Sequence, residues 1–116
     1  MRLLICGDRN WTNKELIRKY IFSLKPDVII EGCARGADSI AGKLAREYNI
    51  ELEEYPANWK KYHIIAGPIR NKQMLVEGKP DFILAFHNDI KNSKGTKNMV
   101  AQSKKAGIKG KVISEK

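Results

Sequence analysis

The sequence lacks the features that mark membrane, secreted and metal-binding proteins. It contains only two cysteines, Cys6 and Cys33, and neither belongs to the spaced Cys or His pairs that bind zinc. No apolar run approaches the roughly 18 residues that span a bilayer, and the start, MRLLICG, lacks the long apolar region and cleavage site of a signal peptide. These absences predict a cytoplasmic protein with reduced thiols, no metal, no bound cofactor and no membrane partner.

Repeats, low-complexity tracts and linker-like segments are also absent from the chain. Its 116 residues, 42% hydrophobic and 30% charged, suit one globular domain, and we expect residues 1–116 to form it. The formal net charge of +9 is compatible with an anionic partner. A solvated basic surface explains the same charge, because many of the basic residues lie in helix-like stretches or near the C-terminus.

Apolar runs alternate with helix-like periodic segments along the whole chain. Strands are predicted at residues 2–6, 28–30, 50–55, 81–86 and 109–114, and helices at 12–25, 37–49, 67–78 and 95–107. This alternation predicts an α/β fold with a parallel sheet of about five strands and helices on both faces. Residues 50–55 alternate apolar and acidic side chains, which is typical of an edge strand. Ligands of such sheets bind beyond the carboxyl ends of the strands, where the strand order reverses.

The stretch VIIEGCARGAD, residues 28–38, has the pattern of a strand, a glycine turn and a helix start. A helix N-terminus binds phosphate or carboxylate, because its first N–H groups are unpaired and carry the positive end of the helix dipole. Gly32 and Gly36 allow a ligand to approach the backbone, and Arg35 adds a forked cation. The alternative is a plain tight turn in which Asp38 caps the following helix.

Three further polar loops carry candidate site residues: GDRNW after the first predicted strand, AGPIRN at the third predicted helix, and NSKGT before the fourth. The candidates are Asp8, Arg9, Asn10, Trp11, Arg70, Asn71, Ser93, Lys94, Gly95 and Thr96. A cation in the first turn of a helix is locally unfavourable, so Arg70 indicates a bound anion or a buried carboxylate. The residues from Ser93 to Thr96 form a second candidate anion cradle. The alternatives are an ordinary Ser cap in that loop and packing of Trp11 on its own helix.

The least regular segment, residues 57–66, is rich in aromatic side chains. Trp59 and Tyr62 flank Lys60 and Lys61, a combination that suits stacking on a nucleobase. The alternative is a small satellite core that closes over the sheet edge. His63 has no partner at metal-ligand spacing, so we predict no metal site there.

Four ordered motifs, CGDRNWTN, EGCARGAD, AGPIRNKQM and SKGTKNM, resemble the YspA-like branch of the SLOG superfamily. That superfamily shares a Rossmann-like fold with the DNA-processing protein DprA and the Lonely Guy cytokinin-activating enzymes. The resemblance, from about residue 3 to 99, implies a three-layer sandwich with a flavodoxin-like sheet and binding of a nucleotide or nucleotide-derived ligand. Carried over by position, the implied contacts are Gly7, Arg9, Trp11, Gly32, Arg35, Gly36, Asp38, Arg70, Asn71, Ser93, Lys94, Gly95 and Thr96.

The resemblance leaves three functional hypotheses. The first is a sensor, carrier or sequestering protein for a nucleotide-like ligand. The second is a nucleoside-phosphate N-glycosidase, but Met99 stands where Lonely Guy enzymes carry their catalytic Glu, and Asn92-Ser93-Lys94 replaces Pro-Gly-Gly. Glu31 and Asp38 are the candidate substitutes for that carboxylate. The third is binding of single-stranded nucleic acid, as in DprA. We rank ligand binding first, and a homo-oligomer is compatible with all three.

Overall fold

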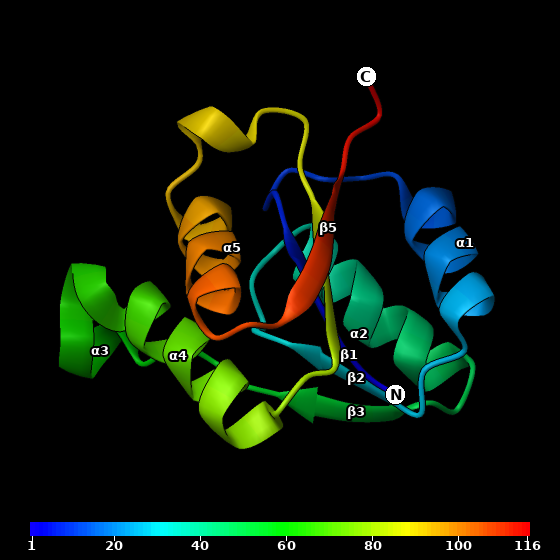
Figure 1. Cartoon of the computed structure of the whole chain (residues 1–116), viewed down its shortest axis with the longest axis horizontal. Helices are drawn as coiled ribbons and strands as arrows, with labels where there is room; N and C mark the ends of the chain where they lie inside the picture. Colours follow the sequence, from blue (N-terminus) through cyan, green and yellow to red (C-terminus); the bar gives the residue numbers. More distant parts are fainter.

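The computed structural model describes all 116 residues, and five parallel strands form its centre (Figure 1). The strands are β1 (Arg2–Gly7), β2 (Val28–Glu31), β3 (Glu51–Glu54), β4 (Phe82–Phe86) and β5 (Lys109–Ile113). The helices are α1 (Lys14–Leu24), α2 (Ala37–Glu47), α3 (Trp59–Tyr62), α4 (Ala66–Gly78) and α5 (Gly95–Lys105), with short 3₁₀ turns η1 (His63–Ile65) and η2 (Ile90–Asn92). No helix is both long enough and apolar enough to cross a membrane.

The strand order is β3-β2-β1-β4-β5, and every neighbouring pair is parallel. The predicted Rossmann-like α/β fold is therefore confirmed, and β3 lies at the edge as expected. The flavodoxin-like order implied by the resemblance is wrong, because that order, 2-1-3-4-5, would put the third strand in the middle of the sheet. Strand β3 reads ELEE, and no interior position would leave its carboxylates in water. The apolar β4, FILAF, occupies the interior place instead.

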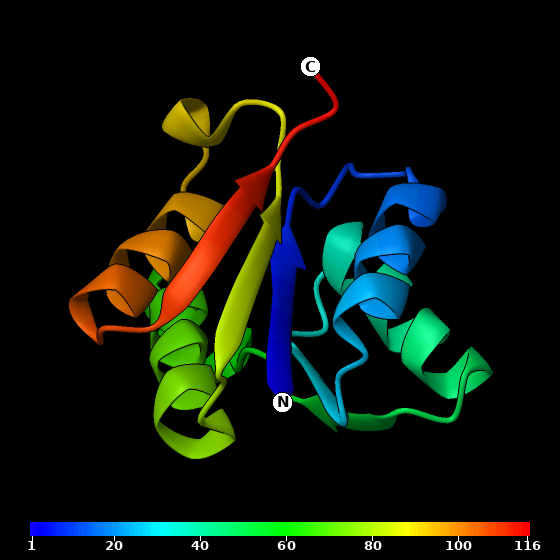
Figure 2. The same cartoon turned by 45° about the vertical axis from the view of Figure 1, so that its right-hand side comes forward.

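Two apolar layers hold the helices to the sheet. Alternate residues of β1 face opposite sides: Leu3 and Ile5 join the core under α1 and α2, while Leu4 and Cys6 join the core under α4 and α5. Figures 1 and 2 show the two helical layers on either side of the sheet. The resulting three-layer sandwich holds the strands rigidly, so that the loops beyond their ends have fixed places.

The start of α1 differs by one residue from the predicted start at Thr12, where Thr12 to Glu15 have the Thr-x-x-Glu pattern of a capping box. Asn13, not Thr12, is the N-cap, and its side-chain oxygen accepts a hydrogen bond from Leu16 N–H at 3.1 Å. The helix ends at Leu24 with a left-handed Lys25, just before Pro26 as predicted. An Asn side chain competes well for the cap, so it displaces the Thr-x-x-Glu pattern by one position.

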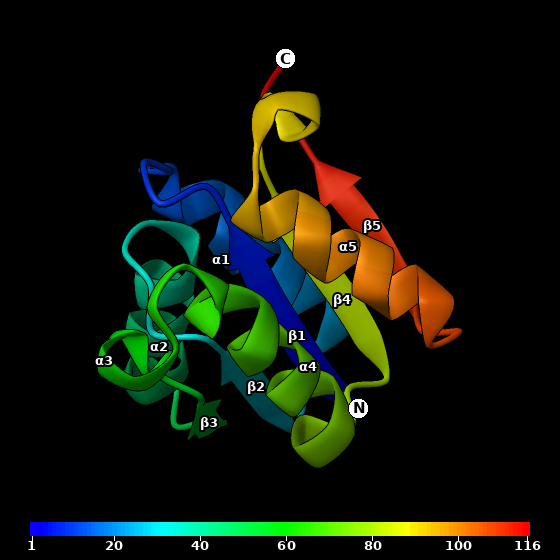
Figure 3. The same ribbon diagram turned by 90° about the vertical axis from the view of Figure 1, so that its left-hand side faces the viewer.

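The carboxyl ends of all five strands lie at one edge of the sheet, where their arrowheads point in Figures 2 and 3. The order of the strands reverses between β1 and β4, which makes this pair the topological switch point. Asp8 N–H donates to the Phe86 carbonyl at 2.9 Å and continues the ladder past the strand ends. The polar loops after β1 and β4 therefore begin side by side.

Candidate functional site

A cavity of about 840 Å³ opens beyond the carboxyl ends of β1 and β4, beside α4 and α5. It is lined by nine of the thirteen residues that the resemblance implies as ligand contacts. These nine are Gly7, Arg9, Asp38, Arg70, Asn71, Ser93, Lys94, Gly95 and Thr96. The other four, Trp11, Gly32, Arg35 and Gly36, do not line it. The structure thus brings together the first, third and fourth motifs and part of the second.

The start of α5 presents unpaired backbone donors to this cavity. The N–H groups of Gly95 and Thr96 belong to the first turn, where no carbonyl of the helix reaches them. The predicted Ser cap is not the N-cap, because Lys94 has that position; the Ser93 hydroxyl, one residue earlier, accepts a hydrogen bond from Lys97 N–H at 2.9 Å. This hydrogen bond uses one donor of the first turn, and the two N–H groups of Gly95 and Thr96 remain at the positive end of the helix dipole.

Arg70 lies in the second turn of α4, because the helix begins at Ala66 and not at the predicted Gly67. Its Nη1 donates a hydrogen bond to the Gly32 carbonyl, and its Nε donates to Asn71 Oδ1 at 3.0 Å. A Cβ at position 32 would lie 2.6 Å from that Nη1, so a glycine is required for the guanidinium to lie across the turn. Gly32 thus positions the Arg70 guanidinium but does not itself line the cavity.

Asn71 connects Arg70 to the start of α5. The side chain is buried, accepts from Arg70 Nε, and donates from Nδ2 to Asn98 Oδ1 at 3.2 Å and the Gly95 carbonyl at 3.4 Å. Gln102 completes the link by donating to Asn98 Oδ1 at 2.7 Å. Asn98 and Gln102 were not predicted from the sequence, because their spacing of four residues on a helix has no distinctive signal by itself. Together these amides fix the guanidinium relative to the helix N-terminus.

Three N–H groups of the glycine turn before α2 are already paired within the chain. The N–H groups of Gly32 and Ala34 both donate to Asp38 Oδ2 at 3.2 Å, and Ala37 N–H donates to the Asp8 carbonyl at 3.1 Å. The buried Asp38 carboxylate therefore already occupies the place of an anion. The alternative role of Asp38 as the helix cap is also wrong, because Gly36 is the N-cap of α2 and no side chain caps the helix.

Arg35, Gly36 and Trp11 also lie outside the cavity. Arg35 lines a separate, smaller depression, so it does not converge with Arg70 as predicted. Gly36 has φ +74°, and a Cβ there would lie 2.2 Å from the Asp8 carbonyl oxygen, so the two loops pack backbone to backbone and direct Arg35 away. Trp11 is 4% exposed and packs in the core beside α1, as the alternative interpretation had it.

The cavity combines cations and carboxylates. Arg9, Arg70 and Lys94 line it together with Asp8 and Asp38. Burial raises the pKa of Asp38 to about 6, while the N–H group of Ala34 and the charge of Arg70 oppose this shift. Asp38 is therefore mostly ionised at neutral pH and forms an electrostatic pair with Arg70. The sequence left two partners open for Arg70, a bound anion or a buried carboxylate. Asp38 is a buried carboxylate of this kind within the chain itself.

An apolar wall closes one side of the cavity. Trp59 and Ile64 line it with 58% and 90% of their surfaces exposed, and Pro68 lines it as well. Trp59 is thus not part of a satellite core, the alternative considered for this segment. Lys61 lies 5.1 Å from the centre of the Tyr62 ring, so this cation and aromatic pair with each other.

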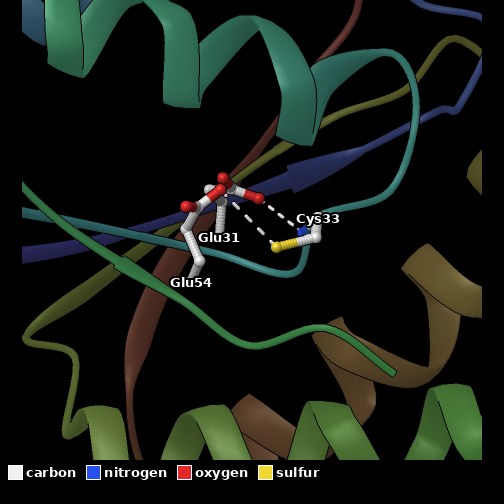
Figure 4. A group of neighbouring side chains, drawn as sticks. All are labelled: Glu31, Cys33 and Glu54. Atoms are coloured by element: carbon white, nitrogen blue, oxygen red, sulfur yellow. Dashed lines mark hydrogen bonds between the residues drawn. The ribbon is translucent and has the colours of Figure 1, made fainter. Parts of the chain in front are cut away.

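A second cluster, missed in the sequence, consists of Glu31, Cys33 and Glu54. Figure 4 shows the two carboxyl groups side by side with the thiol of Cys33 facing them. Their ligand atoms lie within 4.8 Å of one another, and a thiolate with two carboxylates is a donor set that suits a divalent metal ion. The only signal in the sequence is the acidic run of β3, whose Glu54 is the register partner of Glu31. The cluster lies at the smaller depression, so the catalytic candidate Glu31 does not line the large cavity.

Each member of this cluster changes the acidity of the others. Burial and a hydrogen bond with Glu54 raise the pKa of Glu31 to about 8, and the same hydrogen bond lowers the pKa of Glu54. Burial and the charge of Glu31 raise the pKa of the Cys33 thiol to about 12. Both cysteines are free, and burial likewise raises the pKa of Cys6 well above its usual range. Neither thiol is therefore an activated nucleophile at neutral pH.

Comparison with known proteins identifies the family of this chain. The model of the YspA, cpYpsA-related SLOG family matches residues 1–62, which run from β1 through α3 and include the first two motifs. The chain is also 32% identical over 120 aligned residues to Gene 61 protein of Mycobacterium phage D29, and the alignment covers 92% of this chain and 91% of that protein. The chain therefore belongs to the YspA, cpYpsA-related SLOG family.

Proposed function

We propose that the protein binds a nucleotide or a nucleotide-derived, phosphate-bearing small molecule in the large cavity. The observation that carries this proposal is that the unpaired N–H groups of Gly95 and Thr96 line the same cavity as Arg70, to which Asn71 links the start of α5. Backbone donors at a helix N-terminus and a guanidinium are the two groups that proteins use most directly for phosphate. Asn71 holds the two at a fixed separation, so little ordering is needed when an anion binds.

The size and the walls of the cavity suit the rest of such a ligand. Its volume of about 840 Å³ lies within the range of about 300–1,000 Å³ typical of small-molecule sites. With phosphate at the start of α5, the exposed ring of Trp59 offers a stacking surface for a base or another flat group. The position of the cavity at the switch point between β1 and β4 is where parallel α/β sheets bind ligands.

Binding without chemistry is the better supported form of the proposal. Met99 lines the cavity at the position where Lonely Guy enzymes carry a catalytic Glu, and its thioether can neither donate a proton nor stabilise a cationic sugar. A role as sensor, carrier or sequestering protein needs only the cradle and the cavity.

Isothermal titration calorimetry against a panel of nucleoside mono-, di- and triphosphates and ADP-ribose tests the proposal. Arg70→Ala should weaken the binding of the best ligand at least about tenfold, because a charge-assisted hydrogen bond is lost. Arg35→Ala is the matched control, since that arginine lies in the other depression and should leave the affinity unchanged. Absence of binding across the panel, or equal losses in the two variants, would refute the proposal; circular dichroism checks that both variants are folded.

A second candidate function is hydrolysis of the N-glycosidic bond of a nucleoside monophosphate. The observation that favours it is Asp38, a buried carboxylate in the cavity with a pKa raised to about 6. Such a group can stabilise a developing oxocarbenium ion or activate water. Chromatography should then detect free base released by the wild-type protein and by Glu31→Gln, but not by Asp38→Asn. If the wild-type protein releases no free base, the hydrolysis proposal fails and only the binding proposal stands.

A further inference from the structure

Asp8 and His87 form a pair beyond the carboxyl ends of β1 and β4, at the switch point of the sheet. Asp8 follows β1 and His87 follows β4, the two strands between which the sheet order reverses. Both side chains line the large cavity, and His87 Nε2 lies 3.9 Å from Asp8 Oδ2. A direct hydrogen bond would need about 3 Å, so the two atoms face each other across a gap that they do not close.

Each of these side chains is held at its far atom by the backbone of its own loop. Asp8 Oδ1 accepts a hydrogen bond from Asn10 N–H at 2.9 Å, and His87 Nδ1 accepts one from Asp89 N–H at 2.9 Å. Because Nδ1 is an acceptor, the imidazole proton belongs on Nε2. The pair therefore presents one fixed donor, Nε2–H, and one fixed acceptor, Oδ2, to the space between them.

A hydroxyl group is the ligand that this arrangement fits. An oxygen placed about 2.8 Å from both atoms spans the gap, accepts from His87 Nε2–H and donates its own proton to Asp8 Oδ2. A phosphate oxygen fits poorly, because it has no proton to donate and the carboxylate of Asp8 would repel it. A protonated amine fits poorly as well, because it cannot accept from the imidazole.

We infer that Asp8 and His87 bind a sugar hydroxyl of the ligand, so that the cavity selects ribose-bearing phosphate compounds over their deoxy counterparts. The inference rests on the proposed function. His87 and the cradle at Gly95 are joined by one short loop, residues 88–94, so a sugar at the pair and its phosphate at the start of α5 belong to one cavity. Discrimination of this kind is strong in general, since the deoxy compound leaves the donor and the acceptor of the site without their partner.

Calorimetry with AMP, 2′-deoxy-AMP and 3′-deoxy-AMP tests the inference. Asp8→Asn keeps an oxygen for Asn10 N–H but replaces the facing acceptor with a donor, and His87→Asn keeps an acceptor for Asp89 N–H but removes Nε2. The wild-type protein should bind one deoxy analogue about tenfold or more weakly than AMP. Each variant should bind AMP more weakly than the wild-type protein does, by a similar factor. Replacing AMP by that deoxy analogue should then weaken binding to the variant little further. Asp27→Asn, which makes the same charge change at the opposite end of the sheet, should leave all three affinities unchanged.

The outcomes separate this inference from the function on which it rests. Equal binding of AMP and both deoxy analogues to the wild-type protein overturns the inference and leaves the binding proposal standing. A loss in Asp27→Asn as large as in Asp8→Asn also overturns it, because net charge would then explain the effect. Failure of AMP, and of the whole nucleotide panel, to bind the wild-type protein overturns both.

Discussion

Replacing Glu31 by Gln should reduce the loss of stability that the protein suffers between pH 7 and pH 9. The Glu31 carboxyl is buried against Glu54, which raises its pKa from 4.5 to about 8. A raised pKa in the folded state means that the protonated form stabilises the fold. That stabilisation is complete below about pH 4.5 and is lost as the pH rises through 8. Asp38, whose pKa is raised to about 6, loses its contribution mostly below pH 7. The raised pKa values of Cys6 and Cys33 add a loss of stability toward pH 9, but this loss is common to the wild-type protein and Glu31→Gln, so the difference between the two isolates Glu31.

The size of the effect follows from proton linkage. In the unfolded chain Glu31 is ionised throughout this window, whereas in the folded protein it passes from mostly protonated to mostly ionised. With a folded pKa of about 8, Glu31 should contribute a fall of about 1.4 kcal/mol in the free energy of unfolding between pH 7 and 9. In Glu31→Gln this contribution should disappear, because the amide does not titrate, while its oxygen still accepts from Cys33 N–H.

Urea denaturation followed by tryptophan fluorescence measures this difference, since Trp11 is buried beside Phe86 and reports on the core. Glu51→Gln, an exposed carboxyl on the same edge strand, is the matched control and should keep the pH dependence of the wild-type protein. If wild type and Glu31→Gln lose the same free energy between pH 7 and 9, the carboxyl is not protonated in the fold, and the argument from burial fails.

Three further substitutions test how the site is built. Gly36→Ala should lower the free energy of unfolding well beyond Gly107→Ala. Both glycines have positive φ, but only a Cβ at position 36 would lie 2.2 Å from a backbone oxygen. Equal free energies of unfolding for the two variants would contradict this. Gly32→Ala should displace the Arg70 guanidinium and weaken nucleotide binding, measured by calorimetry, with the helical circular dichroism signal retained. Trp59→Ala should weaken the binding of AMP more than that of ribose 5-phosphate, because a stacked base typically contributes about 1–3 kcal/mol. Equal losses of affinity for the two compounds would show that Trp59 does not stack on the base.

Local sequence patterns predicted the elements of this fold because each pattern has a local physical cause. The apolar run of β4, the stop of α1 before Pro26 and the glycine turn before α2 all follow from neighbouring residues. The acidic face of β3 also predicted its place at the sheet edge, and the structure confirms that place. The strand order implied by the resemblance was wrong, although the acids of β3 already argue against a central position for it.

The roles of the site loops depended on contacts between residues far apart in the chain. The sequence by itself determined where the glycines, cations and helix starts fall, and therefore which loops meet beyond the carboxyl ends of the strands. Only the tertiary structure decided which of those loops remain open to a ligand. The N–H groups of Gly32, Ala34 and Ala37 are taken by Asp38 and by the Asp8 carbonyl, whereas those of Gly95 and Thr96 are left unpaired. The reason is that a backbone N–H binds whichever acceptor packs against it, and packing is a property of the whole fold.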